Sequence, residues 1–294
     1  MNLRKVGRLL QGTFKEWQED KASRIAAALA YYTVFSISPL LVIAIAIVGA
    51  FFGQETAQEE ITARLTQLVG EDVVKPVLLA LNNISQPKIR GVASWISIGV
   101  LILGASGIFA QLQDALNTVW KVKPQPGQGI WVFVRKRISS FLMVLAIGLL
   151  FIVSLLLSAI VSALSRYRVD FLPGSTVLWE NIDFIVSLGL TTFLFCLMFK
   201  YVPDAKIAWK DVVVGSVITA LLFMFGKFLL GLYISRGSLG SAYGAAGSLI
   251  VFLAWVYYSA QIILLGAEFT QVYTIMYGSK IRPRKYSQID EDDC

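Results

Sequence analysis

Six long runs of apolar residues decide what this 294-residue chain can fold into. A helix needs about 20 such residues to cross the hydrocarbon layer of a membrane, and only 15% of the residues are charged, whereas soluble domains average about a quarter. The sequence therefore predicts an all-α polytopic membrane protein with a six-helix domain over residues 25–277. The six predicted spans cover residues 30–52, 92–112, 138–164, 182–199, 212–233 and 245–265.

The positive charges predict how these spans are oriented. Six spans separate the chain into seven flanking segments, and the alternate segments that include both ends carry 18 Lys and Arg against 7 in the others. Because cytoplasmic loops are enriched in Lys and Arg, we expect both termini in the cytoplasm. This distribution also accounts for the net charge of +7 without nucleic acid. Membrane lipids are therefore the expected partners, and nucleic acid is not.

The two ends of the chain differ in character. Residues 1–24 place apolar side chains at helical spacing between basic ones, which predicts an amphipathic helix lying on the cytoplasmic leaflet. A helix packed against the cytoplasmic loops remains an equal alternative. The tail, residues 278–294, ends in the acidic stretch "QIDEDDC" and is predicted to be disordered.

The loop over residues 53–91 is the longest on the predicted outer side. Apolar residues from Ile61 to Ile84 form one rough helical stripe, and Pro76 is expected to divide it into two helices. The opposite face is acidic. Such a loop either covers a cavity as a lid or packs on neighbouring helices.

Histidine is absent from the sequence, and this excludes several kinds of site. Histidine-ligated metals, imidazole bases and Ser-His-Asp triads all require it. The two cysteines, Cys196 and Cys294, lie in an apolar run and at the tail, so we expect no disulfide and no thiolate metal site. We therefore expect no metal, no cofactor and no enzymatic activity.

A proline near the middle of the first span marks the first candidate site. Pro39 cannot donate a backbone hydrogen bond, and Ser36 and Ser38 lie beside the break. Many transporters build a substrate or ion site at such a broken helix, whereas an ordinary proline kink healed by serine is the alternative. We count Tyr31, in the same stretch, with these pathway candidates.

A lysine in the fifth span is the second candidate. Lys227 lies in "FMFGKFLLG", about six residues before the predicted end of the span. Its long side chain could reach the membrane surface, or its charge could face a partner or water inside the bundle. No acid is evident at the same depth.

A glutamate near the end of the last span is the third candidate. Glu268 follows Gly266 and Ala267, which permit close helix packing. The second span ends on the same predicted side with polar residues, and together with Glu268 these form a candidate inner gate: Gln111, Asp114 and Asn117. A half-buried structural network is equally consistent with the pattern.

Small residues recur along the spans. "GASG" at 104–107 and Gly215 with Thr219 mark tight helix crossings. Unwound backbone is the alternative, and close packing is favoured.

Four stretches resemble the YihY/BrkB family of bacterial inner-membrane proteins, and the resemblance covers nearly the whole chain. They are "DKASRIAAALAYYTVFSISPLL" (20–41), "LQDALNTVWKV" (112–122), "GKFLLGLYIS" (226–235) and "YGAAGSLIVFLAWVYYSAQIILLGAEFT" (243–270). The resemblance implies about six transmembrane helices, a bacterial inner-membrane location and a link to serum resistance and virulence. The residues that match the family's recurrent pattern are Asp20, Tyr31, Ser36, Pro39, Asn117, Lys227, Tyr243, Gly244 and Glu268.

The family has also carried the label ribonuclease BN, now regarded as a misassignment, and the chemistry of this chain argues against it. A metal-dependent nuclease needs clustered carboxylates or histidines around its ions, and no motif supplies a phosphate cradle. The leading hypothesis is a transporter or permease of an ion or small solute. The alternative is a non-transporting scaffold for envelope assembly, and a homo-oligomer is possible under either hypothesis.

Overall fold

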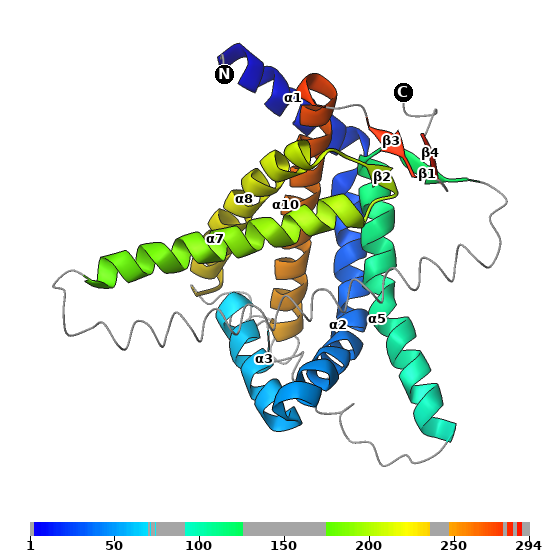
Figure 1. Cartoon of the computed structure of the whole chain (residues 1–294), viewed down its shortest axis with the longest axis vertical. Coiled ribbons are helices and arrows are strands. Elements are labelled where there is room, and N and C mark those ends of the chain that lie inside the picture. The colour runs from blue at the N-terminus through cyan, green and yellow to red at the C-terminus, as the bar shows by residue number, and fades with distance from the viewer. Residues whose placement is uncertain are drawn as a thin grey trace.

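The computed structural model describes residues 3–69, 71, 74, 92–125, 175–235, 247–278, 281–284 and 287–289. These residues are mainly helical, as the apolar runs predict (Figure 1). The helices are α1 (Leu3–Glu19), α2 (Ala22–Phe52), α3 (Gln54–Val69), α5 (Val92–Val119), α7 (Ser175–Tyr201), α8 (Trp209–Ser235) and α10 (Gly247–Tyr277). The strands are β1 (Val122–Pro124), β2 (Ala205–Lys206), β3 (Arg282–Pro283) and β4 (Ser287–Ile289).

Three of the described helices are long and apolar enough to cross a membrane. These spans are Phe184–Tyr201 in α7, Trp209–Leu230 in α8 and Leu249–Tyr277 in α10. Helix α2 adds a fourth if its bent halves, Ala22–Ile37 and Pro39–Ile45, form one span. The chain is therefore a membrane protein with three or four candidate spans among its described residues.

Two of the six predicted spans need separate mention. The span predicted at 92–112 lies within α5, and the span predicted at 138–164 lies outside the described residues. The count of six, and the orientation of the termini, stay predictions.

Helix α2 bends by 50° at its proline and packs there against α5. A proline inside a helix removes one backbone hydrogen bond and crowds the preceding turn, which accounts for the bend. Glycines on α5 let the bend approach closely, because an added Cβ at Gly104 would lie 3.1 Å from Pro39 Cγ. One at Gly107 would lie 3.2 Å from Ser36 Oγ. The "GASG" stretch is thus a packing surface, as predicted.

Helices α8 and α10 interlock through reciprocal glycine and threonine pairs. An added Cβ at Gly215 would overlap Thr270, and one at Gly266 would overlap Thr219. Each threonine hydroxyl donates back to its own helix, Thr219 to Gly215 O at 2.7 Å and Thr270 to Gly266 O at 2.6 Å. The predicted tight crossing at Gly215 and Thr219 is confirmed, and it fixes the part of α10 that precedes Glu268.

Two short antiparallel ladders tie distant parts of the chain together. Strand β1 pairs with β4, with Val122 opposite Ile289, and β2 pairs with β3, with Ala205 opposite Pro283. These strands and α1 lie at the same end of the helices in Figure 1, which we call the strand end. The positive charges predicted that α1 and the segments carrying β1, β2 and the tail strands lie on one side of the membrane. These segments do meet at the strand end. That this side is the cytoplasm stays a prediction.

The described part of the tail, residues 281–284 and 287–289, differs from the disordered segment that its composition predicts. Residues in β3 and β4 pair with strands that follow α5 and α7. The Ser287 hydroxyl donates to Asp204 O at 2.7 Å, and an Arg284 guanidinium N–H donates to Lys200 O at 3.1 Å. These bonds give the tail's polar groups partners that a local sequence pattern does not reveal.

Helix α1 packs along α10 and leaves part of its apolar surface open. Leu9 and Thr13 are buried, and an added Cβ at Gly12 would lie 3.0 Å from Val272 Cγ1. Leu10 and Phe14 remain exposed on the other face. One face of α1 is therefore packed on the protein, as one of the two predictions for residues 1–24 requires. The opposite face exposes apolar side chains, as the prediction of a helix lying on the membrane requires.

The outer-loop region is described only in part. Helix α3 follows α2 directly, and its Ala57 and Ile61 belong to a buried cluster with Leu41 of α2 and Val251 of α10. Pro76, the predicted break between two helices, lies outside the described residues.

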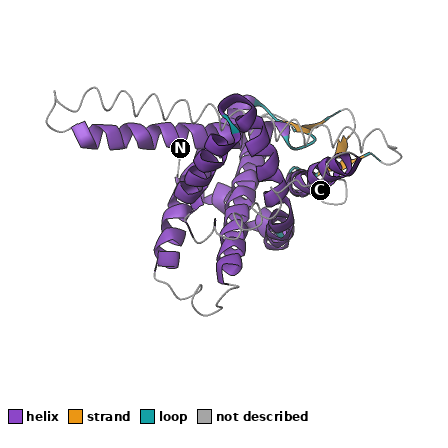
Figure 2. Ribbon diagram, turned by 90° about the horizontal axis from the view of Figure 1, so that it is seen from below, coloured by secondary structure: helices purple, strands orange, loops and turns teal. Residues whose placement is uncertain are grey.

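The largest buried apolar cluster among the described residues lies around the strand end. It joins the first turns of α2 and α8 with α10 and the last turns of α5 and α7, and its members include Trp120, Phe199 and Leu264. Helix α7 packs on α8, and its N-terminal half projects beyond the other described helices in both views (Figure 1 and Figure 2). The rigid cluster positions the polar residues described next.

Candidate functional site

One carboxylate lies completely inside the strand end. Glu268 of α10 has 0% of its surface exposed. Among the described residues, neither of its carboxylate oxygens has a hydrogen-bond partner. Burying an ionised group without partners is costly, so such a residue needs a proton, a counter-charge or water.

The neighbours of Glu268 come from two other parts of the chain. Asp20 directly follows α1, and Lys121 follows α5; both stand at breaks between elements. The Lys121 ammonium donates to Asp20 Oδ1, and its Nζ lies 3.5 Å from Glu16 Oε2. The exposed fractions of the Lys121 and Asp20 side chains are 13% and 4%, so this ion pair is largely removed from solvent.

Both breaks use an unusual backbone conformation. Lys21 has a φ of 53° and Lys121 a φ of 51°, the only described non-glycine residues with positive φ. The left-handed region costs a residue with a Cβ roughly 1–2 kcal/mol. Strain of this kind concentrates at functional sites, where the surrounding structure must hold it.

Electrostatic interactions join these residues into one unit, which we call the Glu268 cluster: Glu16, Asp20, Lys121 and Glu268. The Asp20 carboxyl group is close enough to Glu268 to interact with it electrostatically. Burial alone would lower the pKa of Lys121, but the hydrogen bond and charge of Asp20, with the charges of Glu16 and Glu268, raise it above its ordinary value. Lys121 therefore stays protonated and serves as the cation of the cluster.

The cluster has more acids than bases. Three carboxyl groups share one ammonium, and Asp20 Oδ2 joins the Glu268 oxygens as a buried atom with no partner among the described residues. A buried cluster with excess negative charge favours the uptake of a positive charge. Such uptake is what an ion-binding or proton-binding site does.

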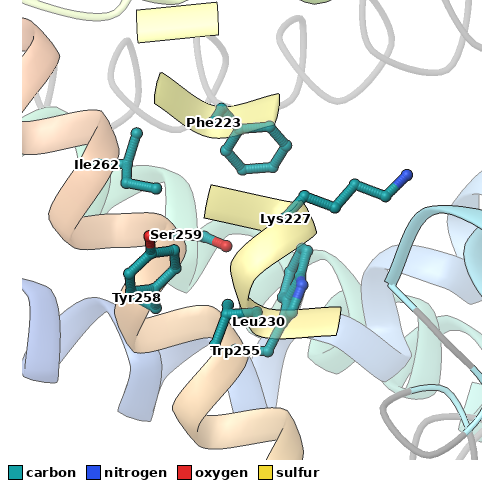
Figure 3. Close-up of a pocket in the computed structure, with 7 residues that line it drawn as sticks. All are labelled: Phe223, Lys227, Leu230, Trp255, Tyr258, Ser259 and Ile262. Atoms are coloured by element: carbon teal, nitrogen blue, oxygen red, sulfur yellow. The ribbon is translucent and has the colours of Figure 1, made fainter. Parts of the chain in front are cut away.

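The region around Lys227 is different. A small pocket, too narrow for a water-sized sphere, adjoins it. The pocket is lined by Phe223, Lys227, Leu230, Trp255, Tyr258, Ser259 and Ile262. Figure 3 shows that the Lys227 ammonium points away from the other lining residues. The Lys227 side chain is exposed on the surface of α8.

A family model for virulence factor BrkB matches residues 13–289. The chain belongs to this family. Its relatives include UPF0761 membrane proteins of Methylibium petroleiphilum, 30% identical over 86% of this chain, and Pseudomonas aeruginosa, 29% identical over 84%. The chain spans 59% and 58% of the length of these two relatives. No solved structure matches it significantly.

Two BrkB-family pattern residues near the proline, Ser36 and Pro39, pack on α5 in this structure. Ser36 is buried against Gly107, and Pro39 lies against Gly104. Tyr31 is exposed on α2. The side chain of Ser38 lies outside the described residues. None of these residues lines the pocket beside Lys227, so the structure does not join them with that lysine into one site.

The predicted gate residues also separate. Asn117 Nδ2 donates to Asp204 Oδ2 at 3.2 Å, and the Asp204 N–H donates to Asn117 Oδ1 at 2.7 Å. Asp114 is exposed, and Gln111 is half-buried. Glu268 is grouped with Asp20 and Lys121.

Sequence reasoning missed Glu16, Lys121 and Asp204 as members of polar sites. The signal for Glu16 was its spacing of four residues from Asp20, which places both carboxylates on one face of a helix. Asp20 itself matched the family pattern. Lys121 looked like one of many basic loop residues, because its distinguishing feature is a contact across 101 positions of the chain.

Proposed function

We propose that this protein transports an ion or a small solute across the bacterial inner membrane, with both termini in the cytoplasm. The proposal includes no catalytic step, and the lack of histidine favours this choice. Membrane lipids and the transported species are the proposed partners, and a homo-oligomer is compatible with the proposal.

The observation that carries the proposal is the burial of Glu268. An ionisable residue inside a membrane span is expensive, and such residues commonly mark ion or substrate pathways. Glu268 lies on the candidate span Leu249–Tyr277 with no exposed surface, and two of the residues around it are themselves ionisable and largely buried.

The mechanism that we propose is alternating access built on two mobile joints. The first joint is the left-handed residue Lys21 between α1 and α2, and the second is the bend at Pro39. Because α1 and α2 both pack on α10, motion at these joints would expose the Glu268 cluster to one side at a time. The bound cargo would change the charge of the cluster and so favour one arrangement.

Transport is tested with purified protein in proteoliposomes. Uptake of a panel of monovalent cations, amino acids, sugars and organic anions is compared for the parent, Glu268→Gln and Glu19→Gln. Glu19 is a matched control because it lies on α1 beside Asp20 but has 55% of its side chain exposed. We expect uptake of at least one species by the parent and Glu19→Gln, reduced by roughly tenfold or more in Glu268→Gln, since about 1.4 kcal/mol corresponds to a factor of ten. Absence of uptake by every protein would overturn the proposal.

A non-transporting scaffold for envelope assembly is the second candidate. The close packing of Pro39 and Ser36 on α5 favours it, because the predicted site at the bend is filled by glycine contacts. A scaffold predicts no uptake in liposomes, together with loss of cellular serum resistance when surface residues such as Leu10 and Phe14 are replaced.

A further inference from the structure

The Glu268 cluster contains two buried carboxyl groups, those of Asp20 and Glu268. Neither group can donate a hydrogen bond while both are ionised. Carboxylates only accept hydrogen bonds, so two of them can bond only when one carries a proton. Asp20 and Glu268 belong to one buried cluster around Lys121, yet Asp20 Oδ2 and both Glu268 oxygens have no hydrogen-bond partner among the described residues. One added proton would give a partner to two of these three atoms.

We propose that Asp20 and Glu268 form a proton-binding site in which Glu268 carries the proton and donates it to Asp20. This inference deepens the proposed function. The proton site itself does not depend on transport, and only the role of the proton as a coupling ion rests on the proposed function. The bond forms by the uptake of one proton on a Glu268 carboxylate oxygen, and no other atom is exchanged.

The hydrogen bond from Lys121 decides which acid is protonated. It gives Asp20 Oδ1 a cationic donor, so Asp20 already acts as a hydrogen-bond acceptor. Glu268 has no such donor among the described residues and is the more deeply buried of the two. Asp20 is therefore the acceptor and Glu268 the acid.

A proton fits this site better than a metal cation. Among the described residues, no group of three or more acidic or cysteine side chains is arranged to hold a metal ion. The Lys121 ammonium already occupies one side of Asp20 and would repel a second cation. A proton needs neither additional ligands nor additional space.

The other helices around Glu268 leave this assignment unchanged. Glu16 of α1 adds a further negative charge to the cluster, and its Oε2 lies 3.5 Å from Lys121 Nζ. The first charged residues of α2, Lys21 and Arg24, are exposed and therefore screened by solvent. Helix α8 meets this part of α10 through the uncharged glycine and threonine pairs, and its buried acid Asp211 lies beside Gly278, farther along the chain than Glu268.

Loss of the proton would act on the helix packing. Two ionised carboxylates would then face each other next to a single ammonium, and their repulsion would push the end of α1 from α10. Lys21 lies next to Asp20 and is the residue at which α1 turns into α2. The proton would thus hold closed the joint that transport requires to open.

Infrared spectroscopy of the full chain in nanodiscs tests the site without any transport assay. The carbonyl band of a protonated carboxyl group is recorded from acid to alkaline pH for the parent, Glu268→Gln and Glu19→Gln. We expect a band that persists at pH values where exposed carboxyl groups are ionised, that remains in Glu19→Gln, and that is lost in Glu268→Gln. In Asp20→Asn the band should shift in frequency and disappear at lower pH than in the parent, because the repelling carboxylate is gone.

A variant-free measurement keeps the test valid if Glu268→Gln does not fold. The parent with ¹³C-labelled glutamate should show an isotope shift of the persistent band, whereas ¹³C-labelled aspartate should not shift it. No persistent band at neutral pH, or a band that shifts only with labelled aspartate, would overturn the proposal.

The coupling role has its own readout in proteoliposomes. If an imposed pH gradient changes the uptake found for the parent at least several-fold, the proton is the coupling ion. If uptake is present but indifferent to the gradient, coupling is refuted while transport stands. If the band is present and no uptake occurs, the proton site stands and the proposed function fails.

Discussion

Lys227 and Glu268 are ionisable residues on neighbouring candidate spans, yet the structure treats them in opposite ways. The Lys227 side chain is exposed, and its ammonium points away from the adjoining pocket. Glu268 is fully buried and lies among other charged residues. The comparison teaches that the position of an ionisable residue along a span does not by itself identify a binding site. The face of the helix on which the residue lies decides whether its side chain is buried or exposed.

The faces differ in what surrounds them. Lys227 shares its surface with exposed apolar residues such as Phe228 and Leu229, a setting in which a long basic side chain follows the apolar surface toward water. Glu268 is held inward by the contacts of Gly266 and Thr270 with α8. A glutamate side chain is too short to leave such a site.

The largest effect is expected when the cation of the Glu268 cluster is removed. Lys121→Met leaves Asp20 and Glu268 without a counter-charge, and breaking a buried ion pair costs about 3 kcal/mol or more. The loss should shrink as the pH is lowered, because the carboxylates then take up protons. Thermal unfolding in detergent across pH measures both effects. The control Lys123→Met, on an exposed side chain, should change stability by less than about 0.5 kcal/mol.

A smaller effect is expected at the packing that holds Glu268 in place. An added methyl group in Gly266→Ala would overlap Thr219, and overpacking of this kind costs about 1–3 kcal/mol. The same change at Gly189 meets no atom within 4 Å and should be neutral or slightly stabilising. Unfolding temperatures of the two variants check this; equal values would show that the α8–α10 contact does not constrain the buried side chain.

Alkaline pH should weaken the Glu268 cluster, because the Lys121 ammonium that balances its carboxylates is then lost. The pKa of Lys121 is raised above 10.5 in the folded protein. A raised lysine pKa contributes stability that is complete below the unfolded value and is lost as the pH rises through the folded value. The unfolding temperature of the parent should therefore fall above about pH 10.5, and that of Lys121→Met should lack this component. Identical pH profiles would contradict the role of the ion pair.

The smallest effect is expected at Lys227. Lys227→Met keeps most of the side-chain length, and Lys227 is not part of the Glu268 cluster, so any uptake should stay within about twofold of the parent. Uptake in proteoliposomes, measured beside Glu268→Gln, checks the difference between the two regions. A loss equal to that of Glu268→Gln would reverse the comparison.

The sequence predicted well those features that depend on local pattern. The apolar runs predicted helices, and the small residues at Gly104 and Gly215 marked close crossings. The alternation of basic segments grouped four parts of the chain that do meet at the strand end. Each of these features is set by length, volume or charge within a short stretch.

The partners of Glu268 could not be predicted in the same way. Asp20, Lys121 and Glu268 are far apart in the chain, and their meeting depends on how α1, α5 and α10 pack. The strands of the tail are two or three residues long, too short for an alternating pattern to be recognised. The proline was found correctly as a bend, but glycines on α5 fill the space that a site would need.

The short ladders at the strand end have a practical meaning for anyone who engineers this chain. Removing the residues after Gly278 would take away β3 and β4 together, and with them the backbone partners of β1 and β2. Asp204 would lose the donors that Arg284 and Ser287 supply. An affinity tag should therefore not replace these residues, because β3 and β4 hold the segments after α5 and α7 together.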